Sequence, residues 1–245
     1  MTNSTVSLDD KYSIESGRIF VTGVQALARI PMVQRQRDVL EGLNTAGFIS
    51  GYRGSPVGGF DQQLWRAKKF LEQNHIRFQP GLNEDLAASA IWGSQQTNLH
   101  EGGKYDGVFA IWYGKGPGVD RCGDVFKHGN MSGPAKHGGV LLIAGDDHAA
   151  KSSTVPHQSE YAFMDASIPV LNPAGVQDIV DYGILGFAMS RFSGCWVAFK
   201  TTAENMDSSS SIDVSPDRVK ISLPNFDMPE DGLSIRWPDD WIEQE

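Results

Sequence analysis

Short apolar runs alternate along the chain with longer amphipathic segments, and this alternation predicts the fold. Runs of β-forming residues predict six buried strands, at about residues 47–52, 75–79, 107–113, 139–145, 168–172 and 194–201. Helical spacing of apolar residues predicts helices at 33–47, 60–74, 83–100 and 175–192. Near-continuous apolar strands that alternate with helices are typical of a parallel sheet covered on both faces. We therefore predict an α/β fold with a doubly wound, mostly parallel six-stranded sheet and helices on both faces.

The pattern changes toward both ends of the chain. Residues 1–16 are polar and acidic and are expected to be disordered or extended, whereas 17–205 hold all the predicted strands and form the predicted domain. From 206 to 245 prolines recur without sustained periodicity, which predicts an acidic, irregular linker. Because Trp237, Trp241 and Ile242 come so late, we expect this tail to dock onto something else and to lead into a further domain downstream.

Charge and cysteine content exclude several classes of protein. The formal net charge is −9, and residues 207–245 contribute ten acidic and three basic side chains, a net −7. An acidic chain without a basic stripe argues against nucleic acid as a partner. Two cysteines, Cys122 and Cys195, are too few to hold an iron–sulfur cluster. No apolar run reaches transmembrane length and no signal peptide is present, so we expect no membrane association and a cytoplasmic location.

Ligands in open parallel sheets bind beyond the carboxyl ends of the strands, so the turns after the strands are the candidate sites. The first such turn, GYRGSPVGG (51–59), matches neither the Walker loop nor the G-x-G-x-x-G pattern. Its glycines free backbone amides, and Ser55 offers a hydroxyl. From pattern alone, an ordinary strand–helix turn is the favoured interpretation.

Two later turns carry ionisable side chains. In GLNEDLAASA (81–90), Asn83 can cap the following helix and place Glu84 in its first turn. The helix dipole stabilises a carboxylate at this position whether or not it has a function. If the carboxylate were buried at a subunit contact, it could also share a proton with a ligand. In WYGKGPG (112–118), Lys115 lies in a glycine-rich loop and is either solvated or a cation for a substrate carboxylate.

The stretch AGDDHAAKSSTVPHQSE (144–160) looks at first like a metal site. Its Asp146, Asp147, His148 and His157 are of ligand type, but neighbouring residues cannot all face one point on an extended or helical backbone. Capping and solvent contact are the favoured interpretation, and no metal ligand is predicted.

In combination, these stretches resemble a known family. GFISGYRGSPVGGFD, GLNEDLAASAIWGSQQ, WYGKGPGVDRCGD, GGVLLIAGDDHAAKSSTVPHQSE and IPVLNPAGVQDIVDYG follow one another in this chain. Their order is similar to that in the N-terminal, pyrimidine-binding domain of the long fused bacterial indolepyruvate ferredoxin oxidoreductases, members of the 2-oxoacid:ferredoxin oxidoreductase superfamily. The resemblance covers about residues 17–245 and implies a thiamine-diphosphate-binding fold.

The resemblance also implies roles for particular residues. Glu84 matches the catalytic glutamate that hydrogen-bonds N1′ of the cofactor's aminopyrimidine. The cofactor-binding residues would be Glu84 together with Tyr52, Gly54, Ser55 and Pro56. The substrate-binding residues would be Ser55, Arg53 and, as a looser match, Lys115.

The implied reaction is oxidative decarboxylation of an arylpyruvate such as indolepyruvate to an acyl-CoA, with electrons passed through [4Fe–4S] clusters to ferredoxin. The chain has no GDG…N motif for Mg²⁺ and diphosphate and no cluster cysteines, so both would lie in downstream domains. We expect a homodimer and an isolated chain without activity. Two alternatives stay open: a binding or scaffold module that kept the fold, and a non-oxidative thiamine-diphosphate enzyme.

Overall fold

The structure is a computed structural model of the 245-residue chain and describes residues 6–230 and 232–237. In this part of the chain, parallel strands form a six-stranded sheet in the order β3-β2-β4-β5-β7-β6. The strands are β2 (Ala46–Gly51), β3 (Ile76–Phe78), β4 (Val108–Lys115), β5 (Val140–Gly145), β6 (Val170–Leu171) and β7 (Val197–Thr201). The predicted fold class is confirmed, and every predicted strand is found near its expected place.

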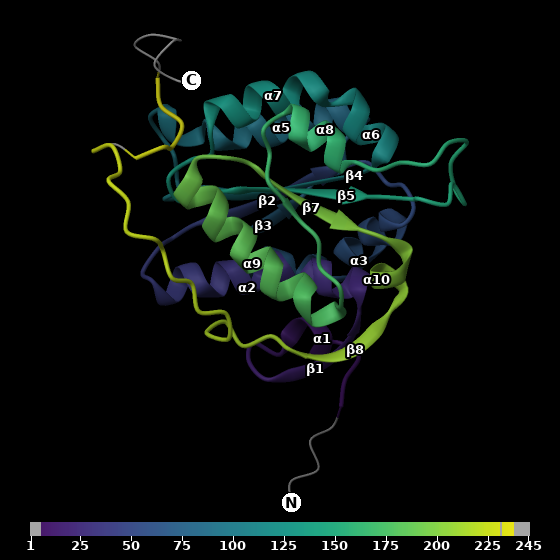
Figure 1. Cartoon of the computed structure of the whole chain (residues 1–245). Helices are drawn as coiled ribbons and strands as arrows, with labels where there is room; N and C mark the ends of the chain where they lie inside the picture. Colours follow the sequence, from purple (N-terminus) through teal and green to yellow (C-terminus); the bar gives the residue numbers. More distant parts are fainter. Residues whose placement is uncertain (1–5, 231, 238–245) are drawn as a thin grey trace, which may run out of the picture.

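Helices cover both faces of this sheet (Figure 1). One face carries α2 (Gly23–Leu40), α3 (Phe60–Arg66), α4 (Lys68–Gln73) and α9 (Val176–Ser193). The other carries α5 (Glu84–Gln95), α6 (Gly116–Arg121), α7 (Gly123–Ser132) and α8 (Glu160–Asp165). The short α10 (Ala203–Asp207) follows β7.

Alternating side chains of the central strands divide the core in two. Along β4, Phe109, Ile111 and Tyr113 pack beneath α2 and α9, whereas Ala110 and Trp112 pack beneath α5 and α7. All five are buried. Helices cover both faces of the sheet, so the side chains on both faces of a strand are apolar. Each strand is therefore a continuous apolar run in the sequence.

Helix α2 departs most from its predicted bounds. The sequence predicted a helix over 33–47, but α2 begins at Gly23, where Thr22 and Gln25 form a reciprocal capping box, and ends at Leu40. Pro31 lies inside it. Ten consecutive residues, 26–35, are buried, so no amphipathic stripe marks the helix. The prediction was wrong because burial on all sides removes the periodicity from which a helix is recognised.

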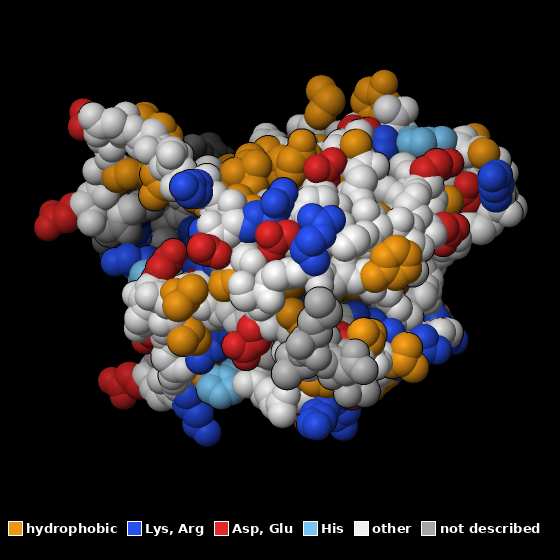
Figure 2. Space-filling model, turned by 90° about the horizontal axis from the view of Figure 1, so that it is seen from below, with side chains coloured by type: hydrophobic (Ala, Val, Ile, Leu, Met, Phe, Trp, Pro, Cys, Tyr) orange, Lys and Arg blue, Asp and Glu red, His pale blue; other side chains and the backbone are white. Residues whose placement is uncertain are grey.

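A second, two-stranded sheet joins segments near the two ends of the chain. β1 (Arg18–Thr22) pairs antiparallel with β8 (Ser209–Asp213), next to α1 (Asp10–Ser13) and beneath α2 and α9 (Figure 1). The buried Arg29 guanidinium donates to the carbonyls of Tyr12 at 2.7 Å and Ile14 at 2.9 Å. These bonds hold α1 and the residue that follows it against α2. Figure 2 shows hydrophobic and charged side chains interspersed on this side of the molecule.

The tail after β8 has neither helix nor strand in its described part, although β8 itself lies within the range 206–245 for which the sequence predicted an irregular linker. Trp237 packs on the chain's own domain, because its indole N–H donates to the carbonyl of Leu99 at 2.9 Å and its ring meets that of His100. Trp241 and Ile242, the other predicted anchors, lie outside the described residues. The division into an N-terminal segment, a domain and a linker stays a prediction.

Candidate functional site

The strand order places a topological switch point at the carboxyl ends of β2 and β4. From β2 the chain crosses to β3 on one side, and from β4 it crosses to β5 on the other, so the two connections diverge at this pair. Open α/β sheets bind ligands at such a switch point. The predicted wall at 51–59 begins here. Lys115, which the sequence placed in a glycine-rich loop, is instead the last residue of β4 and directly precedes α6.

Glycines let these turns pack directly on one another. A β-carbon added to Gly54 would lie 2.8 Å from Cβ of Lys115, and one added to Gly145, at the end of β5, would lie 2.9 Å from Cδ of Pro56. Such distances leave no room for a side chain unless the neighbour moves. The turn after β2 therefore lies against the ends of both β4 and β5.

Glu84 is the first residue of α5, and its position is fixed from several sides. Asn83 caps the helix by accepting a hydrogen bond from the amide of Leu86 at 2.8 Å, as the sequence predicts. The indole N–H of Trp112 donates to the backbone carbonyl of Glu84 at 3.1 Å, which ties the helix start to β4. The Glu84 side chain is 14% exposed and lies so close to Gly118 that a β-carbon there would be 2.5 Å from its Cγ.

Arg121, which was not predicted as a site residue, lies beside this carboxylate. Its Nη1 is 3.5 Å from Oε2 of Glu84, and its Nε is 3.6 Å from Oδ2 of Asp85. The Arg121 side chain is half exposed, so both pairs are weakened by solvent. The neighbouring Cys122 is buried; burial, with the charges of Asp85 and Glu84, raises the pKa of its thiol, which therefore stays protonated and unreactive.

The ammonium group of Lys115 already has partners within the chain. Its Nζ donates to the carbonyl oxygen of Ser152 at 2.6 Å and to Oγ of Ser152 at 2.8 Å, with Oδ2 of Asp147 at 3.9 Å. Hydrogen bonds from the amide and hydroxyl of Ser152 hold the pKa of the Asp147 carboxyl below its usual range. A substrate carboxylate would therefore compete with Ser152 and Asp147, in the loop 147–152, for the ammonium group of Lys115.

His157 lies at the site although the sequence did not single it out as a binding residue. A β-carbon added to Gly116 would lie 2.4 Å from Cβ of His157, so the ring packs directly on the start of α6. Its Nδ1 is 3.6 Å from Oδ2 of Asp120, and the side chain is 14% exposed. Because 40 residues of sequence separate Gly116 from His157, local pattern had no means of bringing them together.

A buried ionic cluster fixes the two ends of the loop that carries His157. Asp146 accepts hydrogen bonds from the amide of Ser159 at 2.9 Å and from its hydroxyl at 2.5 Å. The buried ammonium of Lys200 contacts Glu160 and lies 3.8 Å from Asp146. Burial alone would raise the pKa of the Glu160 carboxyl, but the hydrogen bond from Lys200, a backbone hydrogen bond and the charges of Lys200 and His148 together outweigh burial, and the pKa is lowered.

The predicted wall after β2 is accessible. Tyr52, Arg53 and Ser55 are exposed, whereas Gly54 and Pro56 are partly buried. The Ser55–Pro56 peptide bond is cis. The structure brings these residues together with Glu84 and Lys115 at one edge of the sheet; their roles toward cofactor and substrate stay predictions.

Neither a metal site nor a membrane span is found among residues 6–230 and 232–237. No group of three or more His, Cys, Asp or Glu side chains in this range could hold a metal ion. Asp146 and Asp147 instead accept hydrogen bonds from Ser159 and Ser152. In the same range, no helix is both long and apolar enough to cross a bilayer.

Comparisons with known proteins agree with the fold. No protein-family model and no curated protein sequence matches the chain. Among solved structures it is similar to "2-oxoglutarate:ferredoxin oxidoreductase from Magnetococcus marinus with 2-oxoglutarate, coenzyme A and succinyl-CoA bound", with a TM-score of 0.62 and 15% sequence identity. The match covers 83% of this chain and 33% of that one, so this chain spans a third of the length of its structural relative. At this identity the likeness shows a shared fold.

Proposed function

We propose that this chain is the pyrimidine-binding part of a thiamine-diphosphate-dependent 2-oxoacid:ferredoxin oxidoreductase. The observation that carries the proposal is Glu84, a carboxylate only 14% exposed at the start of α5, beside the switch point at the ends of β2 and β4. The fold shared with a 2-oxoglutarate:ferredoxin oxidoreductase supports the class of enzyme. The motifs that resemble indolepyruvate ferredoxin oxidoreductases support an arylpyruvate as the substrate.

The residues at this switch point fit one end of thiamine diphosphate, its aminopyrimidine ring. The Glu84 carboxylate can hydrogen-bond a ring nitrogen, and the absence of β-carbons at Gly118 and Gly54 lets the side chains of Glu84 and Lys115 pack directly on the neighbouring turns, which fixes where they lie. When bound, thiamine diphosphate supplies the electron sink for decarboxylation of a 2-oxoacid. Because the sequence lacks a GDG…N motif and cluster cysteines, Mg²⁺, the diphosphate and the [4Fe–4S] clusters would be held by other domains.

The chain's own residues would bind, orient and exchange protons. Glu84 would hold, on its carboxyl oxygen, the proton that it shares with the ring nitrogen. Ser55, exposed on the turn after β2, would donate its hydroxyl to the substrate. Lys115 would attract the carboxylate of the 2-oxoacid once that group replaces Ser152 and Asp147.

Further assignments follow from the same proposal. The complete enzyme would pass electrons to ferredoxin, transfer the acyl group to coenzyme A, act as a homodimer and reside in the cytoplasm. The downstream domains of the same enzyme would cover this edge of the sheet, and their contact would exclude water from Glu84.

The test is Glu84→Gln in the complete enzyme, measured as 2-oxoacid-dependent reduction of ferredoxin. The amide can hydrogen-bond the ring but cannot exchange its proton, so we expect turnover to fall by about 100-fold or more. Asp85→Asn is the matched control, because it changes the next carboxylate of the same helix turn, which is 39% exposed, and should keep most of the activity. Full turnover by Glu84→Gln, with unchanged circular dichroism, would contradict the proposal. An active enzyme that contains no iron would favour the non-oxidative alternative.

A further inference from the structure

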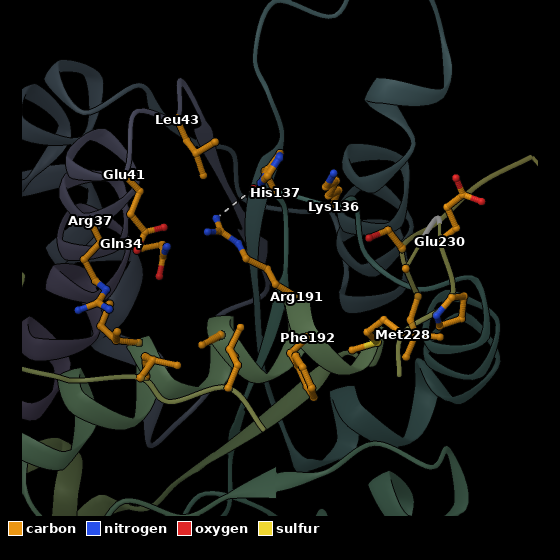
Figure 3. A pocket seen from close by; sticks show the side chains of 18 residues that line it. Gln34, Arg37, Glu41, Leu43, Lys136, His137, Arg191, Phe192, Met228 and Glu230 are labelled. Atoms are coloured by element: carbon orange, nitrogen blue, oxygen red, sulfur yellow. Dashed lines mark hydrogen bonds between the residues drawn. The ribbon is translucent and has the colours of Figure 1, made fainter. Parts of the chain in front are cut away.

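A cavity of about 730 Å³ lies at the amino edge of the sheet, opposite the candidate site (Figure 3). Leu43, just before β2, and His137, just before β5, line it together with residues of α2, α9 and the tail. Small-molecule sites in proteins commonly have volumes of about 300–1,000 Å³. The cavity therefore has room for a ligand of moderate size.

The outer wall of the cavity belongs to the strap, which we define as residues 216–230 and 232–235. Arg37 of α2 holds the first end of the strap, because its Nη1 donates to the carbonyls of Pro216 at 2.5 Å and Val219 at 2.9 Å. At the other end, the amide of Ile235 donates to the carbonyl of Pro134 at 2.9 Å.

Two glycines allow the strap to cross the body at this second end. Gly133 and Gly194 have φ values of +79° and +73°, and a β-carbon on Gly194 would lie 2.4 Å from the carbonyl oxygen of Leu233. The strap is thus fixed on both sides of the cavity and bridges it without filling it.

Apolar side chains form about half of the cavity's lining. They include Leu43, Ile184, Ala188, Phe192, Leu223 and Met228. Such walls would take up a hydrocarbon body and release water from its surface.

Positive charge gathers at one part of this lining. In Figure 3, Arg191, His137 and Lys136 follow one another along the same side, while Glu41 and Glu230 lie on opposite sides of the cavity. Arg191 is held by Asp38 at 2.6 and 2.9 Å, whereas the Lys136 side chain is exposed. An incoming anion can therefore meet the ammonium group of Lys136.

The positive charges near the cavity affect the pKa of the His137 imidazole. Burial lowers its pKa, and the charges of Arg191 and Lys136 lower it further, against the opposing effect of Asp106 and Asp38. A negative charge placed beside the ring would reverse part of this effect.

We propose that the cavity beneath the strap binds an alkyl or aryl monocarboxylate, with the apolar body against Ala188 and Phe192 and the carboxylate beside Lys136 and His137. The exposed ammonium group of Lys136 beside apolar side chains suits a monoanion with a hydrocarbon body, and the exposed Glu41 and Glu230 of the same lining disfavour a dianion. The inference does not rest on the proposed function, because the cavity lies at the other edge of the sheet.

The first experiment compares octanoate with 1-octanol by calorimetry on the full 245-residue chain. Both share the apolar body, and octanoate adds the charge, so we expect octanoate to bind about five-fold more tightly. Lys136→Gln should remove this difference, whereas Lys69→Gln on α4, outside the cavity, makes the same charge change and should preserve it. Equal affinity of the two probes for the unaltered chain overturns the proposal, and so does an unchanged preference in Lys136→Gln.

A second pair of measurements locates the probe. Ala188→Phe places a ring in the cavity and should abolish octanoate binding; retained binding in a folded variant overturns the proposal. In the unaltered chain, octanoate should raise the pKa of His137 in an NMR titration, because an anion beside the ring favours its charged form. An unshifted His137 titration at saturating octanoate likewise overturns it. The NMR measurement and Lys136→Gln do not depend on the folding of Ala188→Phe.

Discussion

At the amino edge of the sheet, Asp38 is fully buried and accepts hydrogen bonds from Gln34 at 2.8 Å, Thr45 at 2.6 Å and both terminal nitrogens of Arg191 at 2.6 and 2.9 Å. At the carboxyl edge, Glu84 keeps 14% of its side chain exposed and has Arg121 no closer than 3.5 Å. The two carboxylates belong to the same sheet but face different surroundings.

The different surroundings of Asp38 and Glu84 indicate that the first carboxylate has a structural role and that the second is free to take a functional one. A buried carboxylate whose lone pairs are all used can only hold the elements around it together. A carboxylate that is partly exposed and loosely paired can exchange its partner for a ligand. The comparison therefore predicts large effects on stability at the amino edge and effects on activity at the carboxyl edge.

The largest expected effect comes from Asp38→Ala. This change leaves the guanidinium of Arg191 without its partner, and breaking such a buried pair costs about 3–5 kcal/mol. Urea unfolding of the full chain measures it. Lys68→Ala, which breaks the exposed pair with Glu72, is the control and should cost at most about 0.5 kcal/mol. If the free energy of unfolding fell by the same small amount in both variants, the contrast between buried and exposed ion pairs would be wrong for this protein.

A middle-sized effect is expected where the strap crosses α9. Gly194→Ala forces a side chain into a left-handed conformation and against the Leu233 carbonyl, so we expect a loss of about 2 kcal/mol and faster proteolysis of the strap. Gly93→Ala is the matched change in α5, where no neighbouring atom lies within 4 Å, and it should instead stabilise the chain by about 0.5–1 kcal/mol. Equal behaviour of the two variants in urea unfolding and limited proteolysis would contradict the described path of the strap.

The smallest effect is a pH dependence at the carboxyl edge. The folded-state pKa of Glu160 is lowered from 4.5, because burial, which raises it, is outweighed by the hydrogen bond from Lys200, a backbone hydrogen bond and the charges of Lys200 and His148 acting together. Its ionised form therefore contributes stability above about pH 4.5, and the contribution is lost as the pH falls through the lowered pKa. Glu160→Gln should melt below the unaltered chain at pH 7, with the gap closing toward pH 3. The exposed Glu101→Gln serves as control, and a gap that stays constant with pH would refute this assignment.

Several features of the fold could be predicted because their causes are local in sequence. The six strands were found from continuous apolar runs, since burial on both faces demands apolar residues at every position. The cap at Asn83 was found from residue type and spacing, because the capping bond spans only three residues. The same cap, with the strand order, places Glu84 at the carboxyl edge.

Other features depend on contacts between distant residues. The start of α2 was missed because Pro31 and burial on all sides hide its periodicity. β8 was missed because it is stabilised by β1, nearly 190 positions earlier. Likewise, no local pattern shows that Ser152 meets Lys115 or that His157 packs on Gly116.

The sequence by itself therefore determined the class of the fold, the strands and the edge at which Glu84 lies, because apolar burial and helix capping act over a few residues. Only the tertiary structure decided which loop pairs with Lys115, which carboxylate is buried with Arg191, and that the strap forms one wall of a cavity. These arrangements depend on how distant segments pack, and a pattern of neighbouring residues does not record that packing.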